Sequence, residues 1–549
     1  MSLPAGLEHY RTPAEVLAAL PAHDGTLPGF FTSRVAFDAS RPFIISPGRA
    51  WNYGEFAQRI ERAAAALSVR GVREGDRVAV MAGNGDWHVM LLFALARLCA
   101  VLVPVNPDLG LEEARYVLCH AEVVGVACAA ETIATAREAC EGMAVAPWFV
   151  TVGDDASTGG TSTLEADMAA SADDAAPNRA TPDATIAIIY TSGTTGFPKG
   201  VMHSQRTFCL SGERHLERCW LQPEGRMLCV LPMFHLNSLF YSIAATVAAG
   251  ASLVVAERFS ASRFWQLAAE TGATHTSLLM AAATILARRP RSEYVLDHRL
   301  AVIVGSPVTR EIAAAFLDEF GVKRMVEGFG MTEIPGAFGV PMDSPQTFGS
   351  MGRPGLHPDH SRLWTQARVV SENNEDVPDE EDGELLVRVP TLMRGYFRDP
   401  AQTAESFHQG WFRTGDLVRR HADGTFSFVA RKKDIIRRRG ENIAGPEIDR
   451  VLGSHPAVAQ AAAIGVPADV GEEEVLAAVV LRPGESATAV DLREWCAAHL
   501  AAFKVPRYIA FVDSLPHTPT HKLAKHVLKK DPNLRASAID TERKPEACN

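Results

Sequence analysis

The sequence predicts an α/β fold of mainly parallel sheets covered by helices. Three apolar runs of strand length, residues 77–81, 100–104 and 301–304, alternate with alanine-rich stretches of helical length. Such alternation is typical of parallel sheets, because the helices that connect their strands also cover the sheet faces. With 549 residues, 47% of them apolar, the chain can form more than one sizeable core.

Three further segments depart from this alternation. Residues 383–389 and 425–429 are short alternating strands beside tight turns such as Asp423-Gly424, a pattern that predicts a small β subdomain. Residues 153–183 are rich in Ser, Thr, Asp, Gly and Ala and lack periodicity. We therefore expect them to form a surface connection.

A charge run that begins at Arg431 indicates a domain boundary. About a hundred residues of mixed α and β pattern follow it, which is a usual size for a separate domain. We expect a large N-terminal domain over residues 1–432, which includes the β subdomain, hinged to a small, mobile α+β domain over residues 433–530. Residues 531–549 are polar and unpatterned, and we expect a flexible tail there.

A hydroxyl-rich glycine loop with one lysine points to nucleotide chemistry. Residues 190–200, YTSGTTGFPKG, directly follow the strand-like run 186–189. The glycines allow a sharp turn and a close approach to phosphate oxygens, the hydroxyls are neutral donors, and Lys199 adds a positive charge. The loop is not the P-loop of kinases and GTPases, because a proline separates Gly196 from Lys199 where that motif requires a Gly-Lys-Ser/Thr triplet.

Composition excludes several other classes of protein. A net charge of −11 argues against general nucleic-acid binding, and residues 1–11 carry no secretory signal pattern. Nine cysteines occur without a Cys-x-x-Cys pair, which fits reduced, buried thiols and a cytoplasmic location. Residues 238–256 lack charge, but Gly250 divides them into a helical piece and a β-branched run, so we expect a buried helix and a core strand rather than a membrane span.

Five segments of the chain, in family order, resemble the AMP-forming adenylating enzymes, the superfamily of acyl-CoA synthetases, luciferases and peptide-synthetase adenylation domains. They cover both expected domains and are the loop 190–200, EGFGMTE at 327–333, WFRTGDL at 411–417, residues 431–447 and residues 515–522. Residues 257–265, ERFSASRFW, are similar to carnitine/crotonobetaine-CoA ligases and fatty-acid-CoA ligases. The resemblance implies ATP, Mg²⁺ and coenzyme A as cofactors.

The resemblance also implies a set of nucleotide-binding residues. Phe329 would flank the adenine, residues 305–307 would cover its other face, and Thr332 would contact the α-phosphate. Asp416, an acceptor-only carboxylate after a tight turn, would bind the two ribose hydroxyls, and Arg431 would touch the nucleotide. The full implied set is Thr191, Ser192, Gly193, Thr194, Thr195, Gly196, Lys199, Gly305, Ser306, Pro307, Gly328, Phe329, Gly330, Met331, Thr332, Asp416, Arg431, Lys433, Gly440, Glu441 and Lys522.

Four residues are implied to take part in catalysis. Glu333 and the Thr191 hydroxyl would share Mg²⁺, which prefers oxygen ligands and bridges to substrate phosphates. Lys522 aligns with the lysine that bridges the attacking carboxylate and the α-phosphate, and Lys199 would add positive charge. The family usually has glycine before the catalytic lysine, where this chain has His521, so the efficiency of adenylation is an open question.

The hinge between the domains is expected at Lys433. Many relatives have two glycines where this chain has Arg439 and Gly440, so one of the two is replaced. The charge run 437–439 has two interpretations that the sequence does not separate. It could form an ordinary solvated surface, or it could bind the phosphates of CoA.

The acyl pocket is expected to include His235, Asn237, Met280 and Gly330. A lone histidine on an apolar segment is more often a buried structural residue than a catalyst, so we expect His235 to be a pocket wall or gate without an acid–base role. Small residues such as Gly336 suggest room for a longer or branched acid, but the sequence does not decide the acyl group.

The predicted function is that of an ATP-dependent acid–thiol ligase, an AMP-forming acyl-CoA synthetase. It would activate an aliphatic carboxylic acid, such as a fatty acid, to an acyl-adenylate and pyrophosphate, and then form the CoA thioester and release AMP. Two alternatives remain: transfer to the phosphopantetheine of a carrier protein, or a degenerate nucleotide- or acyl-binding protein without turnover. We expect the acid, ATP and CoA as partners, with no nucleic acid and no integral membrane segment, and we leave a homodimer open.

Overall fold

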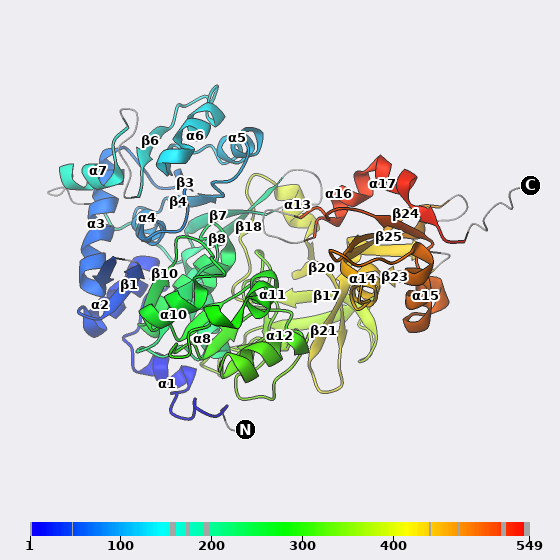
Figure 1. The fold of residues 1–549 in the computed structure, drawn as a ribbon. Helices are drawn as coiled ribbons and strands as arrows, with labels where there is room; N and C mark the ends of the chain where they lie inside the picture. The colour runs from blue at the N-terminus through cyan, green and yellow to red at the C-terminus, as the bar shows by residue number, and fades with distance from the viewer. Residues whose placement is uncertain are drawn as a thin grey trace, which may run out of the picture. The chain divides into compact units, whose positions relative to one another are not determined.

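The computed structural model describes residues 3–46, 48–153, 161–171, 176–191, 198–438, 441–468, 473–517 and 523–542, without the side chains of residues 433, 437, 441 and 442. The chain divides into two compact units, each described here by itself. The first contains Met1–Ala367 and Val387–Phe412, and the second contains Arg368–Leu386 and Arg413–Asn549. Figure 1 shows the elements coloured along the chain.

One seven-stranded sheet of the first unit is parallel except for its last pair. Its order is β13 (Arg324–Val326), β12 (Val302–Val304), β11 (His275–Ser277), β9 (Arg226–Cys229), β10 (Ser252–Val255), β1 (Pro42–Ser46) and β2 (Arg49–Asn52). Only β1 and β2 pair in antiparallel fashion. Because β12 and β13 are parallel neighbours, the loops that follow them leave the same edge of the sheet.

The second seven-stranded sheet positions the glycine loop. Its order is β18 (Gly395–Tyr396), β8 (Lys199–Ser204), β7 (Thr185–Thr191), β4 (Val101–Val105), β3 (Arg77–Met81), β5 (Gly125–Cys128) and β6 (Trp148–Thr151). Strands β7, β8 and β18 pair in antiparallel fashion, whereas the other neighbours are parallel. The predicted strands at 77–81, 100–104 and 301–304 are thus confirmed as β3, β4 and β12.

Helices flank these sheets (Figure 1). Helix α3 (Tyr53–Val69) shows why such a segment is helical: Asn52 caps its first turn in a reciprocal box with Glu55, and its buried residues recur at helical spacing. The remaining helices of this unit are α1 (Pro13–Ala18), α2 (Leu27–Asp38), α4 (Asp86–Arg97), α5 (Leu111–His120), α6 (Ile133–Ala139), α7 (Leu164–Ala170), α8 (Gln205–Cys219), α9 (Ala244–Ala249), α10 (Phe264–Thr271), α11 (Met280–Arg288), α12 (Arg310–Ala314) and α13 (Pro400–Glu405). Short 3-10 and π segments are η1 (Ala130–Thr132), η2 (Asn237–Ile243), η3 (Arg291–Glu293) and η4 (Ala315–Glu319), and the small strands are β14 (Phe338–Gly339), β15 (Arg353–Pro354) and β19 (Phe407–His408).

The uncharged stretch 238–256 is interior structure, as expected. It contains most of η2, then α9 and β10, and all three elements are buried. No helix in the described part of the chain is long and apolar enough to cross a membrane. The expectation of a plain surface connection over 153–183 is wrong in part, because α7 lies within it and buries Leu164 and Met168 against the core.

The second unit contains most of one sheet, whose strand β19 lies in the first unit, and the whole of another sheet. Its first sheet has the order β16 (Gln366–Val370), β17 (Asp382–Arg388), β20 (Trp411–Arg420) and β19, with β21 (Phe426–Arg431) paired to β20. Its other sheet has the order β24 (Val458–Pro467), β25 (Glu473–Leu481), β26 (Tyr508–Phe511) and β27 (Ile539–Asp540). Further elements are η5 (Lys432–Asp434), the hairpin β22 (Ile435–Arg438) and β23 (Glu441–Ala444), α14 (Gly445–Gly453), α15 (Ala489–His499), η6 (Ala502–Lys504), α16 (Lys525–Lys530) and α17 (Pro532–Ser537).

Two sequence expectations differ from this unit's structure. Arg438, expected on a solvated or CoA-binding surface, is only 3% exposed; its Nε lies 2.6 Å from Glu474 Oε2 and its Nη1 donates to the carbonyl of Val505. Arg438 therefore forms an ion pair in the interior of this unit. Part of the expected tail is also folded, because α17 and β27 lie within it, β27 pairs with β26, and Leu534 is buried.

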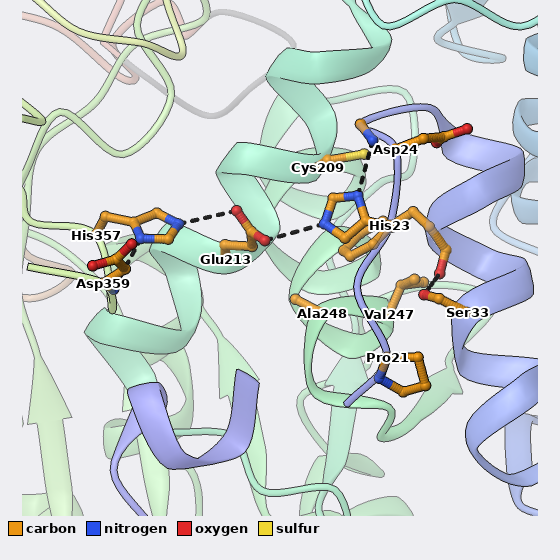
Figure 2. A network of polar contacts seen from close by, with 12 residues as sticks. Pro21, His23, Asp24, Ser33, Cys209, Glu213, Val247, Ala248, His357 and Asp359 are labelled. Carbon is orange, nitrogen blue, oxygen red and sulfur yellow. Dashed lines mark hydrogen bonds and ion pairs between the residues drawn. The ribbon is translucent and has the colours of Figure 1, made fainter. Parts of the chain in front are cut away.

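A buried carboxylate ties three distant segments of the first unit together (Figure 2). Glu213 of α8 accepts hydrogen bonds from His23 Nε2 at 3.1 Å and from His357 Nε2 at 3.0 Å. In both histidines Nδ1 accepts a backbone N–H, from Gly25 and Asp359 respectively, so Nε2 carries the proton in each ring. Burial alone would raise the pKa of Glu213, but the two histidine hydrogen bonds outweigh it and lower the pKa to about 2.

We expect Glu213→Gln to lower the free energy of unfolding by about 3 kcal/mol at pH 7, because it removes the charge to which both histidines donate. The pKa of Glu213 is lower in the folded protein than its usual 4.5, so its stabilisation is fully present above about pH 4.5 and is lost as the pH falls toward about 2. The difference between wild type and variant should therefore shrink on acidification. Thermal unfolding midpoints measured from pH 7 downward would show this.

Glu224→Gln is the matched control for this prediction, because Glu224 forms an exposed ion pair with Arg11. Such surface pairs contribute little, so its midpoint should stay close to that of the wild type at every pH. If Glu213→Gln destabilises the protein no more than the control does, the proposed role of the three-segment tie is wrong.

Candidate active site

Lys199 is held at the mouth of the glycine loop. It is the cross-strand partner of Thr191 in the β7–β8 hairpin, so the loop leaves and re-enters the sheet between these two residues. The Lys199 ammonium donates to Gln402 Oε1 at 2.7 Å and lies 5.1 Å from the centre of the Tyr396 ring. The loop residues Ser192, Gly193, Thr194, Thr195 and Gly196 lie outside the described residues.

Tyr396 joins this lysine to the predicted metal ligand. Its hydroxyl donates to Glu333 Oε1 at 2.9 Å, and the backbone N–H of Met393 donates to the Glu333 carbonyl at 2.8 Å. Burial, and then the charge of Glu333, raise the pKa of Tyr396, so the phenol stays protonated and remains a donor. Two predicted catalytic residues therefore contact the same side chain. Lys199 lies near the Tyr396 ring, and Glu333 accepts from the Tyr396 hydroxyl.

The residues present fit a hard divalent cation. Glu333 is buried, one of its oxygens accepts from Tyr396, and Oε2 has no hydrogen-bond partner among the described residues. The Thr191 hydroxyl donates to the Lys199 carbonyl at 3.5 Å, a long contact that leaves its oxygen lone pairs available. A carboxylate and a hydroxyl are ligands that suit Mg²⁺.

A second buried carboxylate fastens the two loops expected around the adenine. Glu327 Oε1 accepts the backbone N–H of Val308 at 2.8 Å and of Gly349 at 2.9 Å, while Oε2 accepts the Thr347 hydroxyl at 2.8 Å. Gly305 also donates its N–H to the Val326 carbonyl at 3.0 Å. The segment Gly305-Ser306-Pro307 is thereby tied to the strand that leads into Gly328.

The segment from Gly328 to Thr332 has little room for other residues. A Cβ placed on Gly328 would lie 2.7 Å from the Phe338 carbonyl oxygen, and one on Gly330 would lie 2.6 Å from the Tyr241 hydroxyl. Backbone hydrogen bonds join Phe329 to Phe338, and a bridge joins Met331 to Ile334. These contacts leave the Phe329 ring half-buried, as a residue that stacks on a ligand requires.

His203 supports the predicted α-phosphate ligand from behind. Its Nε2 lies 2.7 Å from the Thr332 carbonyl oxygen, to which it donates. Burial lowers the pKa of His203 to about 4, so the ring is neutral at pH 7. The histidine holds the Thr332 backbone without adding charge to the site.

The second unit brings the predicted ribose ligand and Arg431 together. Asp416 of β20 is the cross-strand partner of Arg431 of β21, and its Oδ1 lies 3.3 Å from the arginine Nε. Asp416 is only 1% exposed, and the preceding Gly415 has a φ of +69°, which favours glycine. The backbone of Lys433 lies in η5 and that of Glu441 in β23, whereas Gly440 and Lys522 lie outside the described residues.

The four predicted acyl-pocket residues come from separate elements. Asn237 begins η2, and its buried side-chain oxygen has no hydrogen-bond partner in the described part of the chain. His235 lies just before η2, half-buried with its ring against Phe234. Met280 begins α11, directly after residues whose backbone lies against Gly305. The structure connects η2 to Gly330 through Tyr241.

Sequence reasoning gave no individual role to Tyr396, Gln402 or Glu327. Glu327 is part of the EGFGMTE motif, so the sequence could have indicated this residue. It could not have indicated the residues that Glu327 contacts. Tyr396 is an aromatic residue in an ordinary turn-like stretch, and no local signal separates it from a core residue. Gln402 is 203 positions from Lys199, and only the fold brings the two together.

Comparisons with known proteins agree with this geometry. The AMP-binding enzyme family matches residues 31–397, and the AMP-binding enzyme C-terminal domain matches residues 447–522. The chain is 34% identical to sulfoacetate–CoA ligase of Cupriavidus necator, over 91% of this chain and 96% of that protein, and 29% identical to crotonobetaine/carnitine–CoA ligase of Escherichia coli, over 87% and 93%. ATP-bound MatB from Rhodopseudomonas palustris superimposes with a TM-score of 0.81 at 27% identity, over 91% of this chain and 98% of that one. The chain therefore belongs to the AMP-binding enzyme family and is an ATP-dependent, AMP-forming carboxylate–CoA ligase.

Proposed function

We propose that this ligase activates a small carboxylic acid at the site built from Lys199, Tyr396 and Glu333. The observation that carries the proposal is the position of Tyr396, which contacts the lysine ammonium and donates to the carboxylate. The Tyr396 side chain thus contacts both Lys199, a cation that can bind phosphate, and Glu333, a carboxylate that can bind a metal ion. The folded protein already holds the two groups, a cation and a metal ligand, that would neutralise phosphate charge.

The first step brings two anions together. A carboxylic acid with a pKa of about 4 to 5 is already ionised at pH 7, so the chain needs no general base and must instead offset repulsion between the carboxylate and the triphosphate. Lys199 supplies positive charge at the loop, and we propose that Lys522 supplies it from the C-terminal part. Mg²⁺ held by Glu333 and Thr191 would neutralise further phosphate charge when bound.

We propose a role for each of the residues expected to position the nucleotide. The loops fastened by Glu327 would hold the adenine between residues 305–307 and Phe329, and the Asp416 carboxylate would accept from the ribose hydroxyls. Because Arg431 already contacts Asp416, it would fix the orientation of that carboxylate before the ribose binds.

For the second step we propose that the C-terminal part turns at Lys433. The turn would withdraw Lys522 and admit the CoA thiol, which then displaces AMP from the acyl-adenylate. The domain boundary at residue 433 is part of this proposal. His521, Arg439 and Gly440 lie outside the described residues, so the effect of their side chains on the two steps stays a prediction.

The relatives favour a polar acid over a fatty acid. The two curated relatives act on sulfoacetate and on crotonobetaine or carnitine, all of them short and charged. We therefore propose a short acid with a charged tail as the substrate class, and the fatty-acid expectation stays a prediction. The cytoplasmic location and the homodimer also stay predictions; all cysteines in the described part of the chain are free, which suits a reducing compartment.

The function is tested by incubating the purified protein with ATP, Mg²⁺ and a panel of acids that varies in length and charge. We expect acid-dependent pyrophosphate release, and AMP and thioester formation with CoA but not with a phosphopantetheinylated carrier protein. Thioester formation only on the carrier would establish the carrier alternative. Absence of pyrophosphate release with every acid would instead favour the degenerate binding protein.

We expect Tyr396→Phe to reduce kcat/KM about 10- to 100-fold at limiting Mg²⁺, because a hydrogen bond to the charged Glu333 is lost while the ring beside Lys199 is kept. The Mg²⁺ concentration at half-maximal rate should rise. Steady-state rates at a series of Mg²⁺ concentrations measure this. Tyr294→Phe is the control, since the Tyr294 hydroxyl donates to a carbonyl in another part of the unit, and equal effects of the two changes would refute the assignment.

We expect Lys522→Ala to reduce acid-dependent pyrophosphate exchange about 10²- to 10³-fold, because one cation that offsets the charge of the transition state is removed. Thioester formation from a supplied acyl-adenylate should be nearly unchanged, because the lysine is withdrawn for that step. Lys529→Ala removes an exposed lysine of α16 and serves as the control. A comparable loss in both half-reactions would argue against a role confined to adenylation.

A further inference from the structure

Helix α8 buries two arginines that form no ion pair with any described residue. Arg214 and Arg218 are 4% and 6% exposed, and they lie four residues apart on one face of the helix. Among the described residues neither guanidinium has a hydrogen-bond or ion-pair partner, and the Nε atom of each is fully buried. Such an arrangement is costly, because a buried unpaired charge destabilises a fold by several kcal/mol.

The neighbouring carboxylates are already engaged. Glu213 is satisfied by its two histidines, Glu217 lies 3.5 Å from His360, and both oxygens of Glu327 accept the hydrogen bonds described above. Glu217 and Glu327 act on the arginines only through space. The positive charge on this face of α8 is thus not neutralised by the fold.

Both arginines remain cations at neutral pH. Burial, and then the charge of Arg218, lower the pKa of Arg214 to about 10, and burial also lowers the pKa of Arg218. A pKa of about 10 still leaves the group protonated at pH 7. The protein therefore keeps two like charges side by side in its interior.

Glycines make room for the two guanidinium groups. A Cβ on Gly339 or Gly355 would lie 3.0 Å and 2.9 Å from Arg214 Nη2, and one on Gly328 would lie 2.8 Å from Arg218 Cζ. The Arg214 stem also lies against Gly336. The pair is therefore packed against the backbone that runs through the catalytic segment.

Tyr241 connects this pair to the expected acyl pocket. Its ring stacks on His215, the residue after Arg214, at 5.0 Å between ring centres, and its hydroxyl accepts the backbone N–H of Gly336 at 2.9 Å. The same hydroxyl lies against Gly330, and Tyr241 belongs to η2, the element that Asn237 begins. The two arginines thus lie against glycines of the segment 328–355, and Tyr241 joins that segment to η2.

We propose that Arg214 and Arg218 supply the counter-charge for a second anionic group on the acid substrate, at the end remote from the carboxylate that is adenylated. The inference rests on the proposed function and narrows its substrate class to acids with a carboxylate or sulfonate tail. The planar fork of arginine matches the oxygens of such groups, and the charge of the tail would complete the pairing that the fold leaves open.

The test compares charged acids with neutral isosteres: sulfoacetate with methylsulfonylacetate, and succinate with succinamate. We expect wild-type kcat/KM for the charged member to exceed that for the neutral member at least about tenfold. Arg214→Gln and Arg218→Gln should each reduce this preference by about 10- to 100-fold, the effect of one hydrogen bond to a charged group, with KM for ATP unchanged. Arg206→Gln, which changes an exposed arginine of the same helix paired with Asp183, should behave as wild type.

Thermal unfolding gives a readout that does not depend on turnover. Removing an uncompensated buried charge should leave the midpoint of the free variants unchanged or raise it, whereas a structural arginine would lower it. Sulfoacetate and succinate should raise the midpoint of wild type and of Arg206→Gln, but not that of Arg214→Gln or Arg218→Gln. This rise in the midpoint would support binding of the anionic tail by the two arginines even if no acid released pyrophosphate. A lack of pyrophosphate release would refute only the proposed function.

Three outcomes would overturn the proposal. One is equal use of charged and neutral acids by the wild type. Another is a loss in the arginine variants that is the same for all acids, together with a higher KM for ATP, which would assign the pair to the nucleotide phosphates. The third is a lowered midpoint in both arginine variants without any change in acid preference, which would make the arginines structural.

Discussion

A charge in the low-dielectric interior must be paired, and this constraint organises the first unit of the protein. Glu213 ties three segments together through two histidines, Glu327 fastens two loops through backbone donors, and Glu333 is held by one phenol. In each case the groups that donate hydrogen bonds to the carboxylate come from another segment of the chain. These hydrogen bonds therefore also fix the positions of the segments next to one another. Arg214 and Arg218 are the exception, and they lie next to the backbone that the paired carboxylates hold in place.

Each unit, taken by itself, holds its own predicted site residues in a defined local geometry. In the first unit the carboxyl ends of the parallel strands β12 and β13 place the two loops fastened by Glu327 together, while the β7–β8 hairpin brings Lys199 to Tyr396. In the second unit the register of β20 and β21 sets Asp416 beside Arg431.

Local sequence patterns predicted those features that depend on neighbouring residues. The strands β3, β4 and β12 followed from apolar runs, and the motif segments led to Glu333, Thr332 and Asp416 as predicted site residues because a family pattern is itself local. Contacts between distant residues could not be predicted, as Gln402 with Lys199 shows. Burial was misjudged for the same reason: Arg438 appeared within an exposed charge run, yet its partner Glu474 arrives from another strand.

The glycines that surround Arg214 make its position and theirs interdependent. Gly339 and Gly355 are tolerated because a guanidinium fills the volume that their missing side chains leave. A larger residue at either glycine would collide with the arginine side chain for as long as Arg214 is present. The arginine would therefore have to be replaced before either glycine could be enlarged, so the order of substitutions at these positions is fixed by their shared volume.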